Sequence, residues 1–272
     1  MNYQKTLKEL GISYLGKVAQ SAKMRLSYEH GTMTYCLYLA PWNMVGGGHN
    51  VCGYGKECAP FCLQNSGRNI GDTISHGYEG SLINRSRIRK TRLFYENREL
   101  FMDLLIHEIR KYKARAERMG YGFSVRLNGT SDLSPILFKK NGKNILEIFN
   151  DVQFYDYTKN PNRYNVAKRY SNYDLTFSYN GYNDIECREV LKNGGKVAVV
   201  FYGDMPKVFG GYNVESGNEF DMRYLNSPQS VIGLHYHKTA NDYKVINGKR
   251  TFVAPSTPFV IMPNDKRCEL GF

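Results

Sequence analysis

Short runs rich in β-branched and aromatic residues recur along this chain of 272 residues, with helical patterns between some of them. Runs of this kind, bounded by Gly, Pro, Asn or Asp, are typical of strands. They predict strands at 34–39, 123–127, 152–157, 174–178, 196–202, 230–235 and 259–262. This succession of strands constrains the fold more than any other feature of the sequence.

The segments between the strands contain helical patterns. Over 96–118, Leu100, Leu104, Leu105 and Ile109 recur at helical spacing, so we expect a helix that ends near Gly120. Further helices are predicted at 184–192 and 143–150. Alternating strands and helices imply a parallel sheet, and the number of strands fits an α/β barrel, complete or partial. Without a repeat or an obvious linker, we expect one domain over 1–272.

Polar residues gather directly after five of the predicted strands. In a parallel barrel the carboxyl ends of the strands open on one face, so these residues would converge on a single mouth that binds a small molecule. Each set taken alone fits a helix cap or a turn equally well. The sets include Asn128, Ser131 and Asp132, then Lys159, then Ser178, then Asp204, and finally His235 and Lys238.

A glycine-rich loop with three cysteines follows the first predicted strand and spans 46–66. Cys52, Cys58 and Cys62 have the spacing C-x5-C-x3-C, so the three sulfurs can reach one centre if the loop wraps around it. Thiolates suit zinc or iron and sulfide. Glycines relieve the backbone of steric limits while it wraps. The loop would hang over the same mouth as the polar residues.

Two metals fit this loop. With His49 the cysteines offer H-x2-C-x5-C-x3-C, a Cys3His zinc site. A four-iron, four-sulfur (4Fe-4S) cluster usually takes four thiolates, so three would leave one iron open to another ligand. A loop without metal is the third alternative. The isolated Cys36, Cys187 and Cys268 are expected to be buried small hydrophobic residues.

The chain has no apolar stretch of the roughly 20 residues that a membrane span needs, and it begins without the apolar centre of a signal peptide. We therefore expect a cytoplasmic protein. Because the cytoplasm is a reducing compartment, clustered thiols in such a protein indicate metal or redox chemistry rather than disulfides. The net charge of +12 would attract polyanions such as nucleic acid. Its densest basic run is "RSRIRKTR", from Arg85 to Arg92, which fits a solvated helix face equally well.

The segments "CGYGKECAPFC", "RLNGTSD", "YDYTKN", "LTFSYN" and "VIGLHYHK", in this order, resemble the phage gene-product-88 family over about residues 35–260. That family is itself similar to radical S-adenosylmethionine enzymes, in which three cysteines after the first barrel strand hold a 4Fe-4S cluster. The resemblance implies Cys52, Cys58 and Cys62 as cluster ligands. It also implies a cavity lined by Asn128, Ser131, Asp132, Lys159, Ser178, His235 and Lys238.

The chain departs from radical S-adenosylmethionine enzymes in two motifs. It has neither C-x3-C-x2-C nor a Gly-Gly-Glu segment after the second strand, so the sequence leaves open whether the chain binds S-adenosylmethionine. The fourth iron would then be capped by His49, His76, water or an unknown ligand.

Three functional hypotheses follow from the sequence. The first is a radical-type or redox enzyme that acts on a small molecule or nucleotide, with Asp132, Lys159 and His235 in charge stabilisation and proton transfer. The second is a zinc-stabilised, non-catalytic module that binds nucleic acid or a host protein through its basic face. The third is electron transfer or redox sensing by the metal centre alone.

Overall fold

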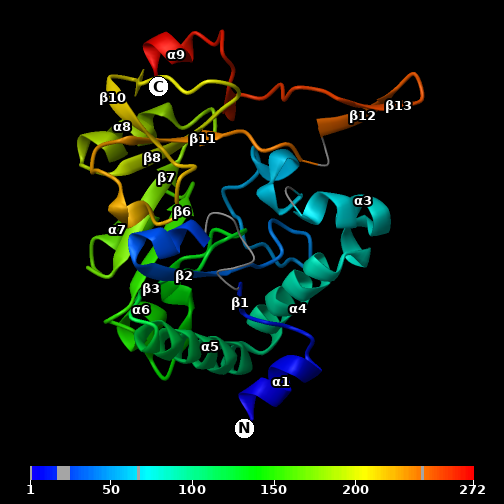
Figure 1. The fold of residues 1–272 in the computed structure, drawn as a ribbon, viewed down its shortest axis with the longest axis vertical. Helices are drawn as coiled ribbons and strands as arrows, with labels where there is room; N and C mark the ends of the chain where they lie inside the picture. Colours follow the sequence, from blue (N-terminus) through cyan, green and yellow to red (C-terminus); the bar gives the residue numbers. More distant parts are fainter. Residues whose placement is uncertain (1, 17–24, 66–67, 240–241) are drawn as a thin grey trace.

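A sheet of ten strands dominates the computed structural model, which describes residues 2–16, 25–65, 68–239 and 242–272 (Figure 1). Residue 66, the last of the predicted cysteine loop, lies outside these ranges. The strand order is β1-β2-β3-β6-β7-β8-β11-β10-β9, and β14 pairs with the end of β8. The bounds are β1 Leu15–Gly16, β2 Thr32–Leu37, β3 Gly122–Arg126, β6 Gln153–Thr158, β7 Tyr173–Ser178, β8 Lys196–Phe201, β9 Val208–Phe209, β10 Tyr212–Ser216, β11 Val231–His235 and β14 Val260–Ile261.

The seven predicted strands are all present, as β2, β3, β6, β7, β8, β11 and β14, with boundaries within two residues of the prediction. The pairings from β2 to β10 and the β14–β8 pairing are parallel. Short antiparallel strands, β1 and β9, lie at the two edges. Parallel strands are covered on both faces, which explains apolar runs such as "KVAVVF" in β8.

The sheet is open over the segments that the structure describes. No pairing there joins β9 or β10 to β1 or β2, so barrel closure is not found. The predicted α/β class with a large, mostly parallel sheet is confirmed, whereas a complete barrel is not. Because β1 and β9 are antiparallel and only two residues long, each edge ends in a short strand that offers little backbone for further pairing.

The helix predicted at 96–118 is confirmed as α5, Arg98–Arg118. Two helices meet at Asn97, whose side chain accepts a hydrogen bond from Leu100 N and so begins the second of them. Helix 184–192 lies where it was predicted. The bounds are α1 Tyr3–Glu9, α3 Arg68–Gly80, α4 Leu82–Glu96, α5 Arg98–Arg118, α6 Ile145–Ile148, α7 Arg163–Ala167, α8 Asp184–Lys192 and α9 Arg267–Leu270.

The helix predicted at 143–150 is shorter than expected. Lys143–Asn144 forms strand β5, which pairs with β4, Lys139–Lys140. The helix is confined to α6 because Asn144 caps it, in a capping box with Glu147.

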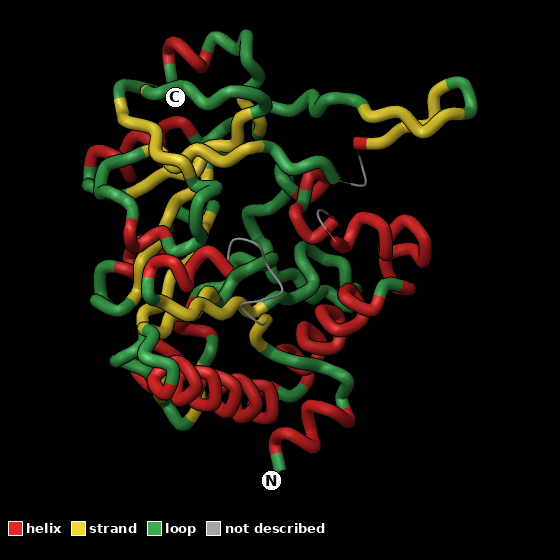
Figure 2. Tube along the Cα trace, viewed as in Figure 1, coloured by secondary structure: helices red, strands yellow, loops and turns green. Residues whose placement is uncertain are grey.

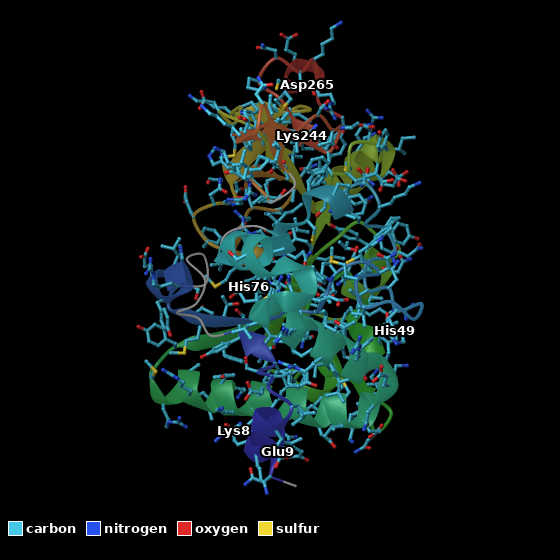
Figure 3. All side chains as sticks on the ribbon, turned by 90° about the vertical axis from the view of Figure 1, so that its right-hand side faces the viewer. Lys8, Glu9, His49, His76, Lys244 and Asp265 are labelled. Carbon is cyan, nitrogen blue, oxygen red and sulfur yellow. The ribbon has the colours of Figure 1, made fainter. Side chains whose placement is uncertain are left out.

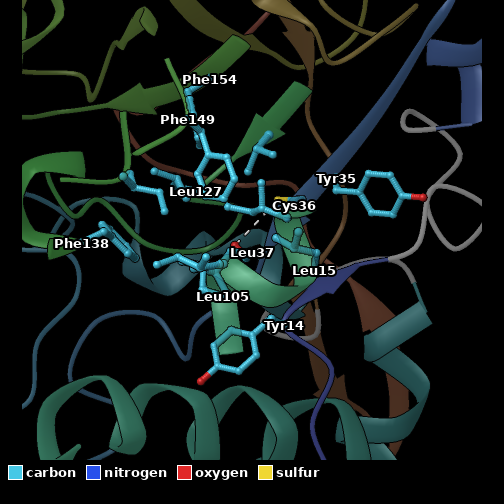
Figure 4. Close-up of a cluster of buried hydrophobic side chains, with 14 of the residues drawn as sticks. Tyr14, Leu15, Tyr35, Cys36, Leu37, Leu105, Leu127, Phe138, Phe149 and Phe154 are labelled. Carbon is cyan, nitrogen blue, oxygen red and sulfur yellow. Dashed lines mark hydrogen bonds between the residues drawn. The ribbon is translucent and has the colours of Figure 1, made fainter. Parts of the chain in front are cut away.

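Helices α5 and α8 cover one face of the sheet, where they pack against β3 and β8. Most strand side chains on that face are apolar, with Asp156 of β6 an exception, and the Tyr35 ring stacks on Tyr112 of α5 with centroids 4.2 Å apart. Figure 4 shows part of this core, to which Leu37, Leu105 and Phe154 belong. Alternation along the strands turns every second residue to the opposite face, here called the inner face. The inner face carries Thr34, Ser124, Arg126, Tyr155, Tyr157, Asp174, Thr176 and Lys196.

A two-stranded hairpin, β12 Tyr243–Ile246 and β13 Lys249–Phe252, forms a separate sheet. It extends away from the other elements in Figure 2. Across the segments that the structure describes, every helix is too short or too polar to cross a membrane.

Candidate functional site

The cysteine loop, residues 46–66, follows β2 in the sequence and is hydrogen-bonded to the loop that follows β3. Gly46, Gly47 and Gly48 have φ of +74°, +61° and +76°, a conformation that residues with a side chain rarely adopt. These angles confirm that the loop uses its glycines to turn. Val51 is fully buried, and its carbonyl accepts a hydrogen bond of 2.8 Å from Asp132 N. The loop is therefore anchored at the carboxyl edge of the sheet.

The three cysteines of the loop are all partly buried. The Cys52 thiol donates to Thr130 O at 3.7 Å, and the Cys58 thiol donates to Gly55 O at 3.4 Å. Gly55 fits closely against Cys52 and Trp42, because a Cβ on it would lie 3.0 Å from Cys52 Cβ. These contacts fold the segment between Cys52 and Cys58 back on itself.

Electrostatics relate the three thiols to one another. The pKa of Cys52 is raised to about 12, mainly by burial, with smaller contributions from the charges of Cys62 and Cys58. Burial also raises the pKa of Cys62 to about 11, with an added contribution from Cys58. Two neighbouring cations, Arg87 and Lys159, oppose that shift at Cys62. The thiols thus lie within electrostatic reach of one another and beside two positive charges.

The structure does not hold a ready-made site for a single metal ion. Throughout the described ranges, no three His, Cys, Asp or Glu side chains form a group that could hold one. A tetrahedral zinc ion with Zn–S bonds of about 2.3 Å would require its sulfur ligands to lie about 3.8 Å from one another, and the described side chains form no group as tight as this. His49, the expected fourth zinc ligand, stacks on the Tyr95 ring at 4.3 Å and 7°. His49 and His76 are at separate places in Figure 3.

Asn128, Ser131 and Asp132 come together after β3 in one hydrogen-bonded network. The Asn128 amide donates to Asp156 Oδ2 at 2.8 Å, and its oxygen accepts from Ser131 Oγ at 2.8 Å. Asp132 accepts from Thr158 Oγ1 at 2.7 Å and from Lys159 N at 2.9 Å. The network links the loops after β3 and β6, so these residues fix the carboxyl edge of the sheet.

Arg163 completes this network, and nothing in the sequence pattern singled it out. Its side chain is 1% exposed and forms ion pairs with Asp132 and with Asp156, the latter at 3.0 Å. It also donates to the hydroxyl of Tyr173. Burial raises the pKa of Asp156, and Arg163 opposes the shift. One signal in the sequence could have indicated Arg163. Asp156 lies inside a predicted strand, a buried carboxylate needs a cation nearby, and Arg163 is seven positions further along the chain.

The remaining predicted site residues are distributed between this edge and the hairpin. Lys159 follows β6, with Nζ 5.3 Å from the ring centroid of Phe259. Ser178 is buried at the end of β7, and its carbonyl accepts from Asn183. His235 is exposed at the end of β11, and Lys238 lies over the Phe252 ring of the hairpin at 4.4 Å.

The isolated cysteines behave mostly as expected. Cys36 and Cys187 are fully buried, which confirms their prediction as small core residues. Cys268 is only partly buried, near the C-terminus, so its prediction was wrong. Its segment follows β14 at the edge of the molecule and has less structure to cover it.

The basic run 85–92 lies on α4, where several of its side chains bind the protein itself. Arg85 donates to Glu79 O, Arg87 to Gln64 O and Arg89 to Gly11 O. Lys90 is buried and donates to Ser13 O at 3.2 Å. These bonds hold the N-terminal segment and the cysteine loop against α4, which makes the run a structural element as much as a charged surface.

The fold and the thiol loop define an α/β protein with an open, mostly parallel sheet and three cysteines anchored at its carboxyl edge. The sequence matches the family described as Gene product 88 over residues 8–251. This match covers most of the chain, so the chain belongs to the phage gene-product-88 family, as the sequence motifs predicted. No curated protein and no solved structure matches the chain.

Proposed function

We propose that this chain holds a 4Fe-4S cluster through Cys52, Cys58 and Cys62 and acts as a redox or radical-type enzyme on a small molecule. The observation that carries the proposal is that one loop holds three partly buried thiols and is anchored at the carboxyl edge of the sheet by the Asp132 N to Val51 O hydrogen bond. In open α/β sheets this edge is where ligands usually bind. The proposal includes the expected similarity to radical S-adenosylmethionine enzymes.

The donor set fits such a cluster in its chemistry. Thiolates are the usual ligands of iron and sulfide. The backbones of Trp42 and Gln64 hydrogen-bond to the thiols of Cys52 and Cys62, and hydrogen bonds to sulfur tune iron–sulfur centres. Arg87 and Lys159 would complement the negative charge of a cluster with three thiolates. Three cysteines leave one iron for a ligand outside the loop.

A bound cluster would supply one-electron chemistry, and the chain's own residues would prepare the site for it. Asp132 accepts a hydrogen bond from the Lys159 backbone, which fixes where that lysine leaves the sheet. The Lys159 ammonium is then available to hold an anionic group of the substrate. Asp132 is itself held by Thr158 and Arg163, so it acts as a positioning residue.

The test is to purify the chain without oxygen and to record absorption and paramagnetic resonance spectra of cysteine variants. Cys52→Ser, Cys58→Ser and Cys62→Ser should each weaken or abolish the iron–sulfur signals. Cys187→Ser and Cys268→Ser are matched controls and should keep them. Spectra without iron–sulfur features in the wild type, or signals that depend on the control cysteines, would refute the proposal.

Nucleic-acid binding is a second candidate function, and the hairpin β12–β13 favours it. The hairpin carries Lys244, Lys249 and Arg250, with no Asp or Glu between residues 243 and 252. Val245 is 77% exposed on the same ribbon. A two-stranded β-ribbon fits the major groove of DNA, and cations on it would contact phosphates. In that case the hairpin, and not the basic run 85–92, would be the surface that binds nucleic acid.

This candidate is tested by titrating labelled duplex DNA at several salt concentrations. Replacing Lys244, Lys249 and Arg250 by Gln should weaken binding and reduce the salt slope by about 2.7, from about 0.9 for each phosphate contact. Gln at Lys139, Lys168 and Lys192 is a control with the same loss of charge elsewhere. Equal effects of the two triple variants would mean that only net charge matters and would contradict a role for the hairpin.

A further inference from the structure

The inner face of the sheet is more polar than a buried face needs to be. A segment after β10 crosses it and brings Asp221, Arg223 and Tyr224 onto the strands, where the short 3-10 helix η6, Arg223–Leu225, contacts β6 and β7. The Tyr224 ring packs edge-on against Tyr155 at 5.6 Å. Charged side chains therefore lie in a buried layer that apolar side chains usually fill.

Most of these charges are paired within the protein. Arg126 donates to both carboxylate oxygens of Asp221 at 3.1 Å, and the Tyr155 hydroxyl donates to Asp221 at 3.0 Å. Lys196 donates to both oxygens of Asp174, at 2.9 and 2.7 Å. Two cations therefore face two carboxylates, and these four charges balance.

Arg223 is the exception. Its side chain is 0% exposed, and its Nε donates to the Asp221 backbone carbonyl at 3.2 Å. Its two terminal nitrogens, Nη1 and Nη2, are buried and have no hydrogen-bond partner among the described residues. Buried charged donors are almost always paired, because leaving one unpaired costs free energy. The Arg223 guanidinium lies over the Phe220 ring, 5.0 Å from its centroid, but no carboxylate forms an ion pair with it among the described residues.

Two further donors without a partner surround the same spot. Thr176 Oγ1 and Arg126 Nε are both buried and unpartnered in the described part of the chain. Thr176 pairs in register with Tyr157, and the Arg126 guanidinium lies 4.6 Å from the Tyr157 ring centroid. The Arg223 carbonyl accepts a hydrogen bond of 2.7 Å from Lys196 Nζ, and Lys196 pairs in register with Thr176. The three unsatisfied groups thus gather around one tyrosine.

We infer that Arg223 binds an oxyanion, the carboxylate or phosphate group of a small molecule, on the inner face of the sheet beside Tyr157. The two terminal nitrogens of a guanidinium form a planar fork that matches two oxygens of such a group. One negative charge would balance the excess positive charge of the face. Thr176 and Arg126 Nε would complete the recognition. The site requires no metal, so it goes beyond the function proposed above.

The test measures binding of two simple probes, sodium phosphate and sodium acetate, to the full chain by calorimetry and by thermal unfolding at constant ionic strength. At least one probe should bind and raise the unfolding midpoint, since a ligand of the folded state stabilises it. Arg223→Met should weaken that binding roughly tenfold or more. Arg169→Met, which removes an exposed arginine, is the matched control and should change nothing.

A second variant covers the case in which Arg223→Met fails to fold. Thr176→Val keeps the shape and every charge, and it should weaken the same probe without altering the far-ultraviolet circular dichroism. The stronger probe identifies the oxyanion as carboxylate or phosphate. Binding that persists unchanged in Arg223→Met and Thr176→Val, or no binding of either probe, would overturn the inference. Cys58→Ser should leave probe binding intact, so a failure of the oxyanion-site proposal can be distinguished from a failure of the metal-centre proposal.

Discussion

Replacing Arg163 by Met would remove the cation that joins the loops after β3 and β6. The guanidinium contacts Asp132, Asp156 and Tyr173, and both Arg163 and Asp156 are almost fully buried. Removing one partner of a buried ion pair costs about 3–5 kcal/mol, because the other charge remains buried. For a chain of this size that corresponds to an unfolding midpoint lower by roughly 10 °C.

The loss should depend on pH in a defined direction. Burial raises the pKa of Asp156 and Arg163 opposes the shift, so the variant should have a still higher Asp156 pKa. A raised folded-state pKa means that stability is lost as pH rises from the unfolded pKa through the folded one. The difference in free energy of unfolding between wild type and variant should therefore be largest near pH 7 and shrink as pH falls.

Denaturant unfolding at several pH values measures this difference. Arg169→Met is the surface control, and Asp156→Asn combined with Arg163→Met should recover part of the loss, because the stranded charge is gone. A difference under about 1 kcal/mol at pH 7, or one that is independent of pH, would refute the assignment of Arg163 as the ion that holds this edge.

Two further predictions concern the packing of the site. Gly129→Ala would place a Cβ against Cys36 Sγ and within 2.6 Å of the Tyr38 ring, so it should destabilise the fold by about 1–3 kcal/mol in thermal unfolding. Gly53→Ala, which meets nothing within 4 Å, should be close to neutral, and equal effects would count against the close packing. Cys36 and Cys187 should resist alkylation at pH 8 in the folded chain, because both are fully buried and burial raises the pKa of each thiol, at Cys36 to about 12. Mass spectrometry after native and denatured labelling checks this, and rapid native labelling of either would contradict it.

The strands were predictable because their local pattern is strong. Runs such as "KVAVVF" combine β-branched residues with flanking glycines, and parallel strands buried on both faces need little else. Helix Asp184–Lys192 was predictable for a similar reason, since Asn183 and the glycines at 194 and 195 are local start and stop signals, although the Asn183 side chain makes no capping hydrogen bond. The start of the helix predicted at 96–118 was also close, since Asn97 caps α5 directly before Arg98.

The site was only partly predictable because its polar groups pair over long distances. Asn128 and Asp132 were identified as polar residues after a strand, but their partner Asp156 lies within another strand and Arg163 follows that strand. Likewise, Asp221 meets Arg126 across 95 positions, and no local spacing announces that pair. Closure of the barrel depends on how the two sheet edges end, and the sequence pattern carried no signal for the short antiparallel strands β1 and β9.

Elemental analysis of the protein prepared without oxygen decides whether Cys52, Cys58 and Cys62 hold a 4Fe-4S cluster. The measurement is iron, acid-labile sulfide and zinc per chain in the wild type and in the Cys58→Ser variant. We expect about four irons and four sulfides per wild-type chain, and a large loss of both in the variant. Chain that contains one zinc and no iron, or iron that the variant keeps, would contradict it.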